Sequence, residues 1–144
     1  MKNLILFLLL LPFFCSSQTL TLNDTTYNVT LQFDTSFVST YPELPKDMEV
    51  VSMSNSYNTI IIDTVSGTIE VTRDSKLYPE GSITMSLEII SIKESELYGT
   101  TYNLYDYYNG NYGFLFVKKD GTIIFSLQDM AFINEYHGFI GFIN

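Results

Sequence analysis

The stretch Gly99–Gln128 reads GTTYNLYDYYNGNYGFLFVKKDGTIIFSLQ, and it decides the fold class. Two turn signals interrupt it, Asn109-Gly110 and Asp120-Gly121, and both dipeptides tolerate the positive φ angles of tight hairpin turns. β-Branched and aromatic residues, which favour strands, fill the segments between the turns. The stretch therefore predicts a meander of three antiparallel strands, at about Gly99–Tyr108, Asn111–Lys119 and Thr122–Gln128.

Turns of two residues would fix how these strands pair. They predict that Tyr105 lies opposite Phe114, that Phe114 lies opposite Leu127, and that Phe116 lies opposite Phe125. One face would then carry Tyr105, Phe114, Phe116, Ile123, Phe125 and Leu127, and the other Tyr102, Leu104, Leu115, Val117 and Ile124. Both faces are apolar, so we expect a second sheet, a helix, a partner chain or lipid to cover them.

The rest of the chain repeats the pattern of short apolar segments between turn residues. Thr25–Phe33 alternates between apolar and polar residues, as a half-buried strand does. Ser82–Lys93 shifts its apolar phase after Ile89, which predicts a β-bulge at that point. A two-residue turn at Ser66-Gly67 would join two further strands. The other expected strands are Met48–Met53, Asn58–Val65, Thr68–Arg73 and Phe139–Ile143.

These segments predict an all-β domain of eight or nine strands, without an internal repeat of 20 to 50 residues. An antiparallel sandwich or a small closed barrel of about eight strands would accommodate them. Asp129–Tyr136 is predicted as one short C-terminal helix, with Asp129 as its N-cap and Gly138 as its stop. We expect residues 18–144 to form a single β-domain.

The first 18 residues, MKNLILFLLLLPFFCSSQ, have the layout of a secretory signal peptide. Lys2 gives a positive start, an apolar run follows, and small residues end the segment. The apolar run is shorter than the roughly 20 residues that a membrane span needs. Cleavage after Ser17 would remove residues 1–17 and leave Gln18 first. We therefore expect export by way of a signal peptide, to the periplasm, the envelope or the medium.

A lipidated N-terminus at Cys15 is the alternative way of processing this segment. Cys15 is the only cysteine in the chain and lies where the apolar run ends. Peptidases that release a lipid-bearing cysteine need a small residue before it, whereas this chain has Phe14. Lipidation would hold the domain on a membrane.

The chain without its leader is strongly acidic. All 16 acidic residues remain, against six basic ones once Lys2 is removed from the seven, so the net charge is −10. Such a surface repels the phosphates of nucleic acids, and we expect no nucleic-acid partner. It also repels anionic lipid, so association with a membrane is expected only for a lipidated chain or a membrane barrel.

Residues suited to catalysis are scarce. His137 is the only histidine, and no Gly-x-Ser-x-Gly motif presents a nucleophile. Zinc and copper sites would lack their usual ligands without a second histidine or a cysteine in the mature chain. The carboxylate pairs Asp47/Glu49 and Glu94/Glu96 have polar neighbours that predict solvated positions. We expect no catalytic residue, metal or cofactor, and a hydrolase is the least favoured function.

One tyrosine-rich segment points to binding. Six of the 11 tyrosines lie between Tyr98 and Tyr112, among asparagines and Asp106. Aromatic rings beside amide and carboxylate groups suit carbohydrate, because a ring stacks on the apolar face of a sugar while polar groups bind its hydroxyls. Packing is the other interpretation, since tyrosine is also a good strand residue. The candidate ligand-binding residues are Tyr107, Tyr108, Asn109, Asn111 and Tyr112.

The most favoured function is therefore a non-catalytic module that binds an unknown ligand or protein partner, with carbohydrate as the candidate ligand. The alternative is a small outer-membrane β-barrel or a structural envelope protein. Apolar residues on both faces of the strands favour that alternative. Met48–Met53 is shorter than the roughly 9–11 residues of a spanning strand, which argues against it.

The processing of the leader can be tested by mass measurement of the mature protein. We expect a chain that begins at Gln18, with or without cyclisation of this glutamine, because Ser17 precedes the cut and Phe14 spoils the lipidation signal. A chain that begins at Cys15 and carries acyl mass would contradict this expectation.

Overall fold

The computed structural model describes residues 17–22, 26–32, 47–54, 56–75, 82–128 and 135–144. Within these ranges the fold is all-β and has no helix, which confirms the expected fold class. No helix in the described ranges is long and apolar enough to cross a membrane. The strands are β1 (Ser17–Thr21), β2 (Thr26–Gln32), β3 (Asp47–Ser54), β4 (Ser56–Asp63), β5 (Thr68–Ser75), β6 (Ile83–Ser95), β7 (Gly99–Asp106), β8 (Asn111–Lys118), β9 (Thr122–Gln128) and β10 (Glu135–Phe142).

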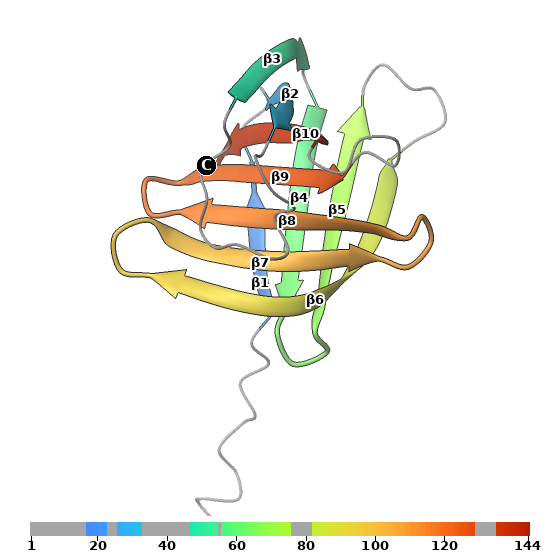
Figure 1. The fold of residues 1–144 in the computed structure, drawn as a ribbon, viewed down its shortest axis with the longest axis vertical. Helices are drawn as coiled ribbons and strands as arrows, with labels where there is room; N and C mark the ends of the chain where they lie inside the picture. Colours follow the sequence, from blue (N-terminus) through green and yellow to red (C-terminus); the bar gives the residue numbers. More distant parts are fainter. Residues whose placement is uncertain (1–16, 23–25, 33–46, 55, 76–81, 129–134) are drawn as a thin grey trace, which may run out of the picture.

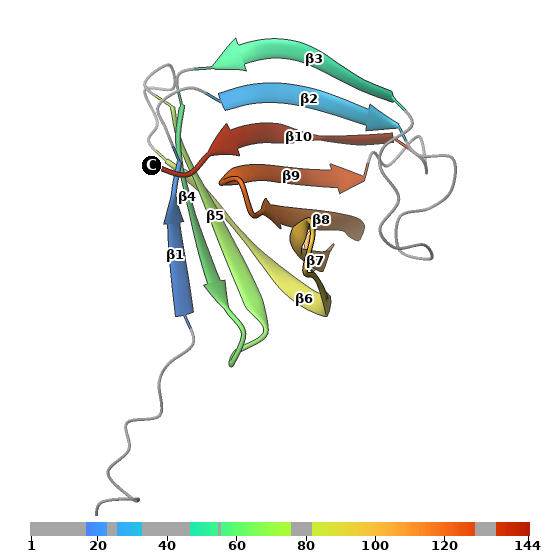
Figure 2. The same ribbon diagram turned by 90° about the vertical axis from the view of Figure 1, so that its left-hand side faces the viewer.

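The ten strands form one antiparallel sheet in the order β1-β4-β5-β6-β7-β8-β9-β10-β2-β3. The sheet curls into a half-barrel (Figure 1). Figure 2 shows β3, β2, β10, β9 and β8 stacked above one another, with β1, β4 and β5 running steeply across one end of the stack. The more specific expectation of a sandwich or a closed eight-stranded barrel is not confirmed.

The main hydrophobic core lies on the concave side of the curled sheet. Its side chains come from β1, β4 and β5 at one end of the sheet order and from β6 to β10 further along it, so β1, β4 and β5 pack against β8, β9 and β10. The rings of Phe125 and Phe139 lie 5.3 Å apart within it. Burying each large apolar side chain contributes about 1.5–3 kcal/mol. The buried members are Leu20, Leu22, Ile60, Ile62, Ile69, Val71, Leu87, Tyr102, Leu104, Leu115, Ile123, Phe125 and Phe139.

A second, smaller cluster lies on the convex side. Val29 and Leu31 of β2 are buried there, together with Phe114 and Tyr136, whose rings lie 5.8 Å apart. Phe114 belongs to this cluster and its neighbour Leu115 to the main core, because successive strand residues point to opposite faces. The prediction that both faces of the meander are apolar is thereby confirmed.

The β4–β5 turn is longer than the predicted two residues. Asp63 lies opposite Thr68, so residues 64–67 form the loop. Asp63 Oδ1 accepts hydrogen bonds from the backbone nitrogens of Val65 and Ser66, at 2.9 and 3.1 Å. Gly67 ends the loop at φ 72°, a conformation that glycine adopts without strain. The Asp63 carboxylate at the end of β4 therefore stabilises a turn that is longer than two residues.

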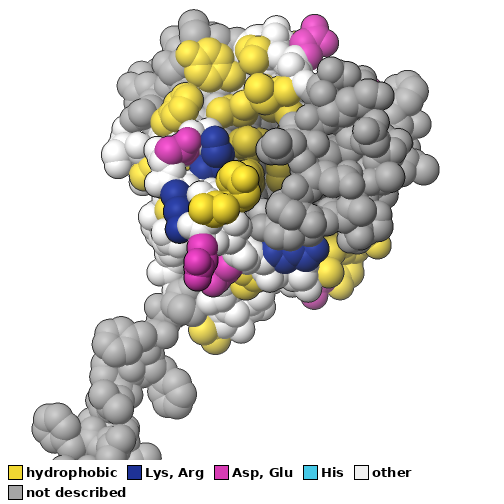
Figure 3. Space-filling model, turned by 60° about the vertical axis from the view of Figure 1, so that its left-hand side comes forward, with side chains coloured by type: hydrophobic (Ala, Val, Ile, Leu, Met, Phe, Trp, Pro, Cys, Tyr) yellow, Lys and Arg dark blue, Asp and Glu magenta, His cyan; other side chains and the backbone are white. Residues whose placement is uncertain are grey.

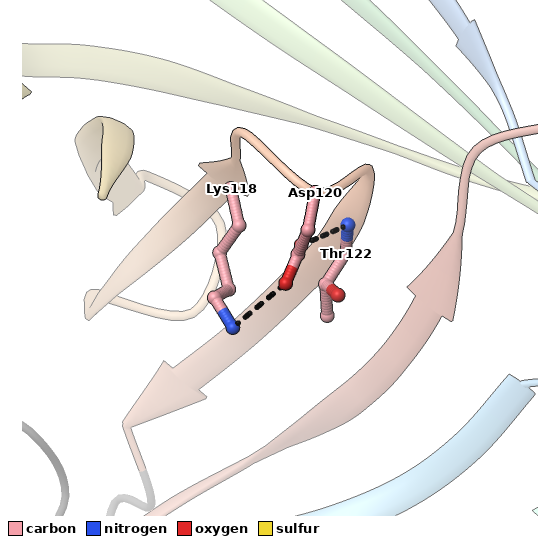
Figure 4. A network of polar contacts seen from close by, with 3 residues as sticks. All are labelled: Lys118, Asp120 and Thr122. Carbon is pink, nitrogen blue, oxygen red and sulfur yellow. Dashed lines mark hydrogen bonds and ion pairs between the residues drawn. The ribbon is translucent and has the colours of Figure 1, made fainter. Parts of the chain in front are cut away.

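A carboxylate also stabilises the β8–β9 turn. Asp120 Oδ1 accepts a hydrogen bond from the backbone nitrogen of Thr122 at 2.9 Å, and Asp120 Oδ2 lies 3.3 Å from Lys118 Nζ (Figure 4). The backbone nitrogen of Gly121 donates to the Lys118 carbonyl at 3.1 Å. Strand pairing ends at Lys118 and resumes at Thr122, so the turn is one residue longer than Asp120-Gly121 alone.

The β7–β8 turn, residues 107–110, is also longer than two residues, and with the β8–β9 turn it makes the predicted register of the meander wrong. Tyr105 lies opposite Tyr112, and Phe114 lies opposite Asn103. Across β8 and β9, Phe114 faces Ser126, Phe116 faces Ile124, and Leu115 faces Phe125. The shift of one residue between β8 and β9 moves Ile123, Phe125 and Leu127 to the concave face, where they join Leu115.

The bulge predicted in Ser82–Lys93 is confirmed. The register of β6 against β7 shifts between Ile89 and Ser91, which leaves Ile90 as the extra residue. The predicted helix Asp129–Tyr136 is wrong where it can be examined, because Glu135 and Tyr136 belong to β10. Residues 129–134 of that segment lie outside the described ranges. Tyr136 pairs with both β9 and β2, and Glu135 pairs with β2, so β10 begins at Glu135.

The β8–β9 turn gives a prediction about acid stability. Hydrogen bonds from Thr122, with a smaller contribution from Lys118, lower the pKa of Asp120 to about 2. Because this pKa is below that of an unfolded aspartate, Asp120 stabilises the fold above about pH 4, and the contribution is lost as the pH falls towards 2. An NMR titration should place the Asp120 carboxyl near 2. In Asp120→Asn, unfolding by urea should depend less on pH over this interval, and an ordinary aspartate pKa at position 120 would contradict the expectation.

Candidate functional site

The β7–β8 hairpin brings three tyrosines together. Tyr105 and Tyr112 lie opposite each other on neighbouring strands, with ring centroids 5.1 Å apart and ring planes 53° apart. Tyr107, the first residue of the turn, packs edge-on against Tyr105 at 4.9 Å and 89°. Tyr105, Tyr107 and Tyr112 form a tyrosine cluster. It lies on the convex face, because Tyr112 is two residues before Phe114 on the same strand.

The turn displays its aromatic rings to solvent. Tyr107 is 71% exposed and Tyr108 is 91% exposed, while Tyr112 is 40% exposed at the start of β8. Tyr105 is half-buried beneath the first and third of these rings. Of the predicted site residues, the structure therefore brings Tyr107 and Tyr112 together through Tyr105, a residue that the prediction did not include.

Asp106, buried at the end of β7, fixes the conformation of this turn. The side chain is only 4% exposed. Its Oδ1 accepts hydrogen bonds from the backbone nitrogens of Tyr108 at 2.9 Å and Asn109 at 3.4 Å. Its Oδ2 accepts from Asn109 Nδ2 at 2.7 Å, and its carbonyl accepts from the backbone nitrogen of Gly110 at 2.7 Å. Because these acceptors bind the turn itself, the displayed rings rest on a preorganised backbone.

The role of Asp106 was not foreseen from the sequence. Asp106 was grouped with the polar residues that could meet a sugar hydroxyl, whereas the structure uses its carboxylate inside the turn. The side-chain nitrogen of Asn109 donates to this carboxylate, so Asn109 also makes its hydrogen bond within the turn. The signal was present, because an aspartate followed four residues later by glycine occurs both at Asp63-Gly67 and at Asp106-Gly110. Asn111, another predicted site residue, is half-buried and lies opposite Asp106.

Glu88 of β6 completes the polar surroundings of the tyrosine cluster. It is exposed and lies directly opposite Tyr105. The Glu88 carboxylate, by hydrogen bonding and by its negative charge, raises the pKa of Tyr107. Sequence reasoning did not find Glu88, because it belongs to another hairpin. Only the register of β6 against β7 brings it to the tyrosines.

His137 contacts a hydroxyl group through one ring nitrogen and a carboxylate through the other. It lies on β10 and is exposed. Its Nδ1 is 3.2 Å from Thr30 Oγ1, and its Nε2 is 3.1 Å from Glu135 Oε1. Glu49, Glu94 and Glu96 are also exposed. In the described part of the chain, no group of three His, Cys, Asp or Glu residues could hold a metal ion.

Comparisons with known proteins do not name a family for this chain. No family model matches it, and neither a curated protein nor a solved structure gives a match. A function for the chain must therefore be argued from the geometry and chemistry of the hairpin itself.

The role of Asp106 leads to a prediction about stability. Asp106→Ala should lower the free energy of unfolding by roughly 2–3 kcal/mol, because several charge-assisted hydrogen bonds to the turn are lost. Urea unfolding measures this loss. Asp63→Ala is the matched control, since Asp63 caps an equivalent turn from an exposed position and should cost less. Equal losses of unfolding free energy in the two variants would show that the burial of Asp106 does not increase its contribution to stability.

Proposed function

We propose that this protein is an exported, non-catalytic binding module, in which a small β-barrel displays the tyrosine hairpin to a ligand. One observation carries the proposal: Tyr107 and Tyr108 are the most exposed rings of the hairpin, yet their backbone is held by a buried carboxylate. A turn that served only to reverse the chain would not need exposed aromatic rings. Exposed tyrosines on a rigid backbone are typical of recognition surfaces, because they offer a large contact area at low cost in conformational entropy.

The scaffold is proposed to be a closed barrel of eight strands. The pairing of β1 with β4 supports this, because it continues in the same register as that of β2 with β3. Thr21 lies opposite Thr59, and Thr26 lies opposite Ser54. The number of residues from Thr21 to Thr26 therefore equals the number from Ser54 to Thr59, as it would in one continuous antiparallel ladder. We therefore propose to count β1 with β2 as the first strand of the barrel and β3 with β4 as the second, called bent strands below; residues 23–25 and 55 between them lie outside the described ranges.

The ends of the sheet support the same closure. Leu22, just after β1, forms an antiparallel bridge with Ile143, just after β10. The backbone nitrogen of Asn144 also donates to the Thr21 carbonyl at 3.2 Å. The first bent strand thus contacts both the second bent strand and β10. Each of the eight strands then follows the previous one around a ring, and a ring leaves few free edges.

The outer-membrane barrel is the less supported of the two functions considered. Strands that face lipid carry apolar side chains outward and polar ones inward. Here the concave side holds the main apolar core, while Glu70, Ser86 and Glu88 are exposed on the convex side of β5 and β6. This distribution supports a barrel that is surrounded by water.

The proposed ligand class is carbohydrate. The tyrosine cluster offers ring faces for stacking, and Glu88 offers carboxylate oxygens for hydroxyl groups. Export by way of the leader would bring the domain to a compartment where polysaccharide occurs. Residues 1–16 of the leader lie outside the described residues, whereas Ser17, its last residue, is the first residue of β1.

Binding by the hairpin is tested with single alanine substitutions and a glycan array. Tyr107→Ala and Tyr112→Ala should weaken binding about tenfold or more, because their rings form one surface with Tyr105. Tyr108→Ala should have a smaller effect if Tyr107 and Tyr108 point to opposite sides, as neighbours in an extended chain do. All three variants should stay folded, as judged by thermal unfolding.

Tyr98→Ala is the matched control, because Tyr98 is also an exposed tyrosine in a hairpin turn but lies at the other end of β7. That end is seen in Figure 3, where hydrophobic side chains lie beside both basic and acidic ones. The control should bind like the unaltered protein. No binding to any glycan, combined with lower melting temperatures for Tyr107→Ala and Tyr112→Ala, would show that these tyrosines serve packing alone.

A further inference from the structure

The geometry points to a more specific ligand, and this step rests on the proposed function. We propose that the tyrosine cluster and Glu88 recognise a sugar that carries a positively charged amino group, in preference to neutral and acidic sugars. The site would bind the ammonium through the faces of the tyrosine rings and through the Glu88 carboxylate.

The rings of the cluster can hold a cation from more than one direction. Tyr107 stands at 89° to Tyr105, and Tyr112 is tilted by 53° from it. The face of each aromatic ring carries a negative electrostatic potential and attracts an ammonium group that lies within about 6 Å of the ring centre. A sugar stacked on one ring would therefore bring its substituents near the face of another.

Glu88 adds a formal negative charge to this surface. Directly opposite pairs in an antiparallel ladder have Cβ atoms roughly 5 Å apart, so the Glu88 side chain starts beside that of Tyr105. Its carboxylate is near enough to Tyr107 to raise the pKa of that tyrosine, so it lies towards the exposed side of the cluster. A carboxylate has about four acceptor positions, so contact with one hydroxyl leaves capacity for an ammonium group.

The charge of the surrounding chain favours the same ligand. No lysine or arginine occurs between residues 94 and 117, a range that includes the whole β7–β8 turn. The basic residues nearest to this range lie at the far ends of their strands, where Lys93 is opposite Thr101 and Lys118 is opposite Gly99. The net charge of −10 for the chain without its leader would attract cationic ligands and repel uronic acids.

The experiment compares three short oligosaccharides of equal length by titration calorimetry: glucosamine oligomers, N-acetylglucosamine oligomers and glucuronic acid oligomers. The first carries ammonium groups, the second is neutral and the third is acidic. The unaltered protein should bind the glucosamine oligomer about tenfold more tightly than the neutral one, the size expected for an exposed cation–π contact combined with an exposed ion pair. The acidic oligomer should bind most weakly.

Glu88→Gln is the decisive variant, because it keeps the shape of the side chain and removes its charge. It should lose most of the preference for the glucosamine oligomer and retain binding of the neutral one. Glu96→Gln is the control for overall charge, since Glu96 is exposed in the β6–β7 turn, at the other end of β6. This control should keep the preference.

Equal binding of the glucosamine and N-acetylglucosamine oligomers by the unaltered protein would overturn the inference and leave the proposed function intact. An equal loss of preference in Glu88→Gln and Glu96→Gln would also overturn it, because the effect would then come from net charge. Absence of binding to all three oligomers would overturn both the inference and carbohydrate as the ligand class.

Discussion

The arrangement of the sheet depends on aspartate carboxylates that accept hydrogen bonds from backbone N–H groups in the hairpin turns. Asp63 and Asp106 each bind two such groups, and Asp120 binds one. A carboxylate that occupies these donors favours a turn longer than two residues, and the length of a turn sets the pairing of the strands that follow it. Since a shift of one residue exchanges the two faces of a strand, the turns determine which side chains enter the core. The burial of Ile123 and Phe125 beside Leu115 on the concave face follows from the turn at Asp120.

The limits of prediction from the sequence have the same origin. Alternation and turn signals located strands at Thr25–Phe33, Asn58–Val65 and through the meander, and a phase shift located the bulge in β6. The predicted register is wrong because the dipeptides are only part of their turns, which aspartate side chains cap and lengthen. β1 was missed because Ser17–Thr21 is largely polar and adjoins the leader, so it lacks the alternation of a buried strand. The predicted helix at Asp129–Tyr136 failed at its end, since pairing on both sides outweighs the local preference of Glu135 and Tyr136.

The candidate site divides into a part that local sequence could reveal and a part that it could not. The tyrosines are close together in sequence, so their concentration was visible, and their exposure in the turn agrees with a binding surface. Asp106 is part of the same segment, but its role depends on which backbone and side-chain donors of the turn bind its carboxylate, and the sequence does not show this. Glu88 is separated from Tyr105 by an entire hairpin, and its position depends on the pairing of β6 with β7. Long-range register of this kind is an outcome of packing and is not encoded in any short motif.

The bulge in β6 connects this scaffold to its proposed recognition chemistry. Beyond the bulge, Ser91 lies opposite Asn103 and Ile92 opposite Tyr102. If that register continued with Ile90 paired in the ladder, Ile90 would lie opposite Leu104, Ile89 opposite Tyr105, and Glu88 opposite Asp106. Two carboxylates would then meet on the concave side, where neighbouring positions are apolar, and charges buried in such surroundings are costly. The bulge instead places Ile89 opposite Leu104 at the core and Glu88 opposite Tyr105 on the convex face. The register shift at the bulge thus places the negative charge of Glu88 beside the tyrosine cluster and not beside Asp106, which is why we treat the bulge as part of the proposed site.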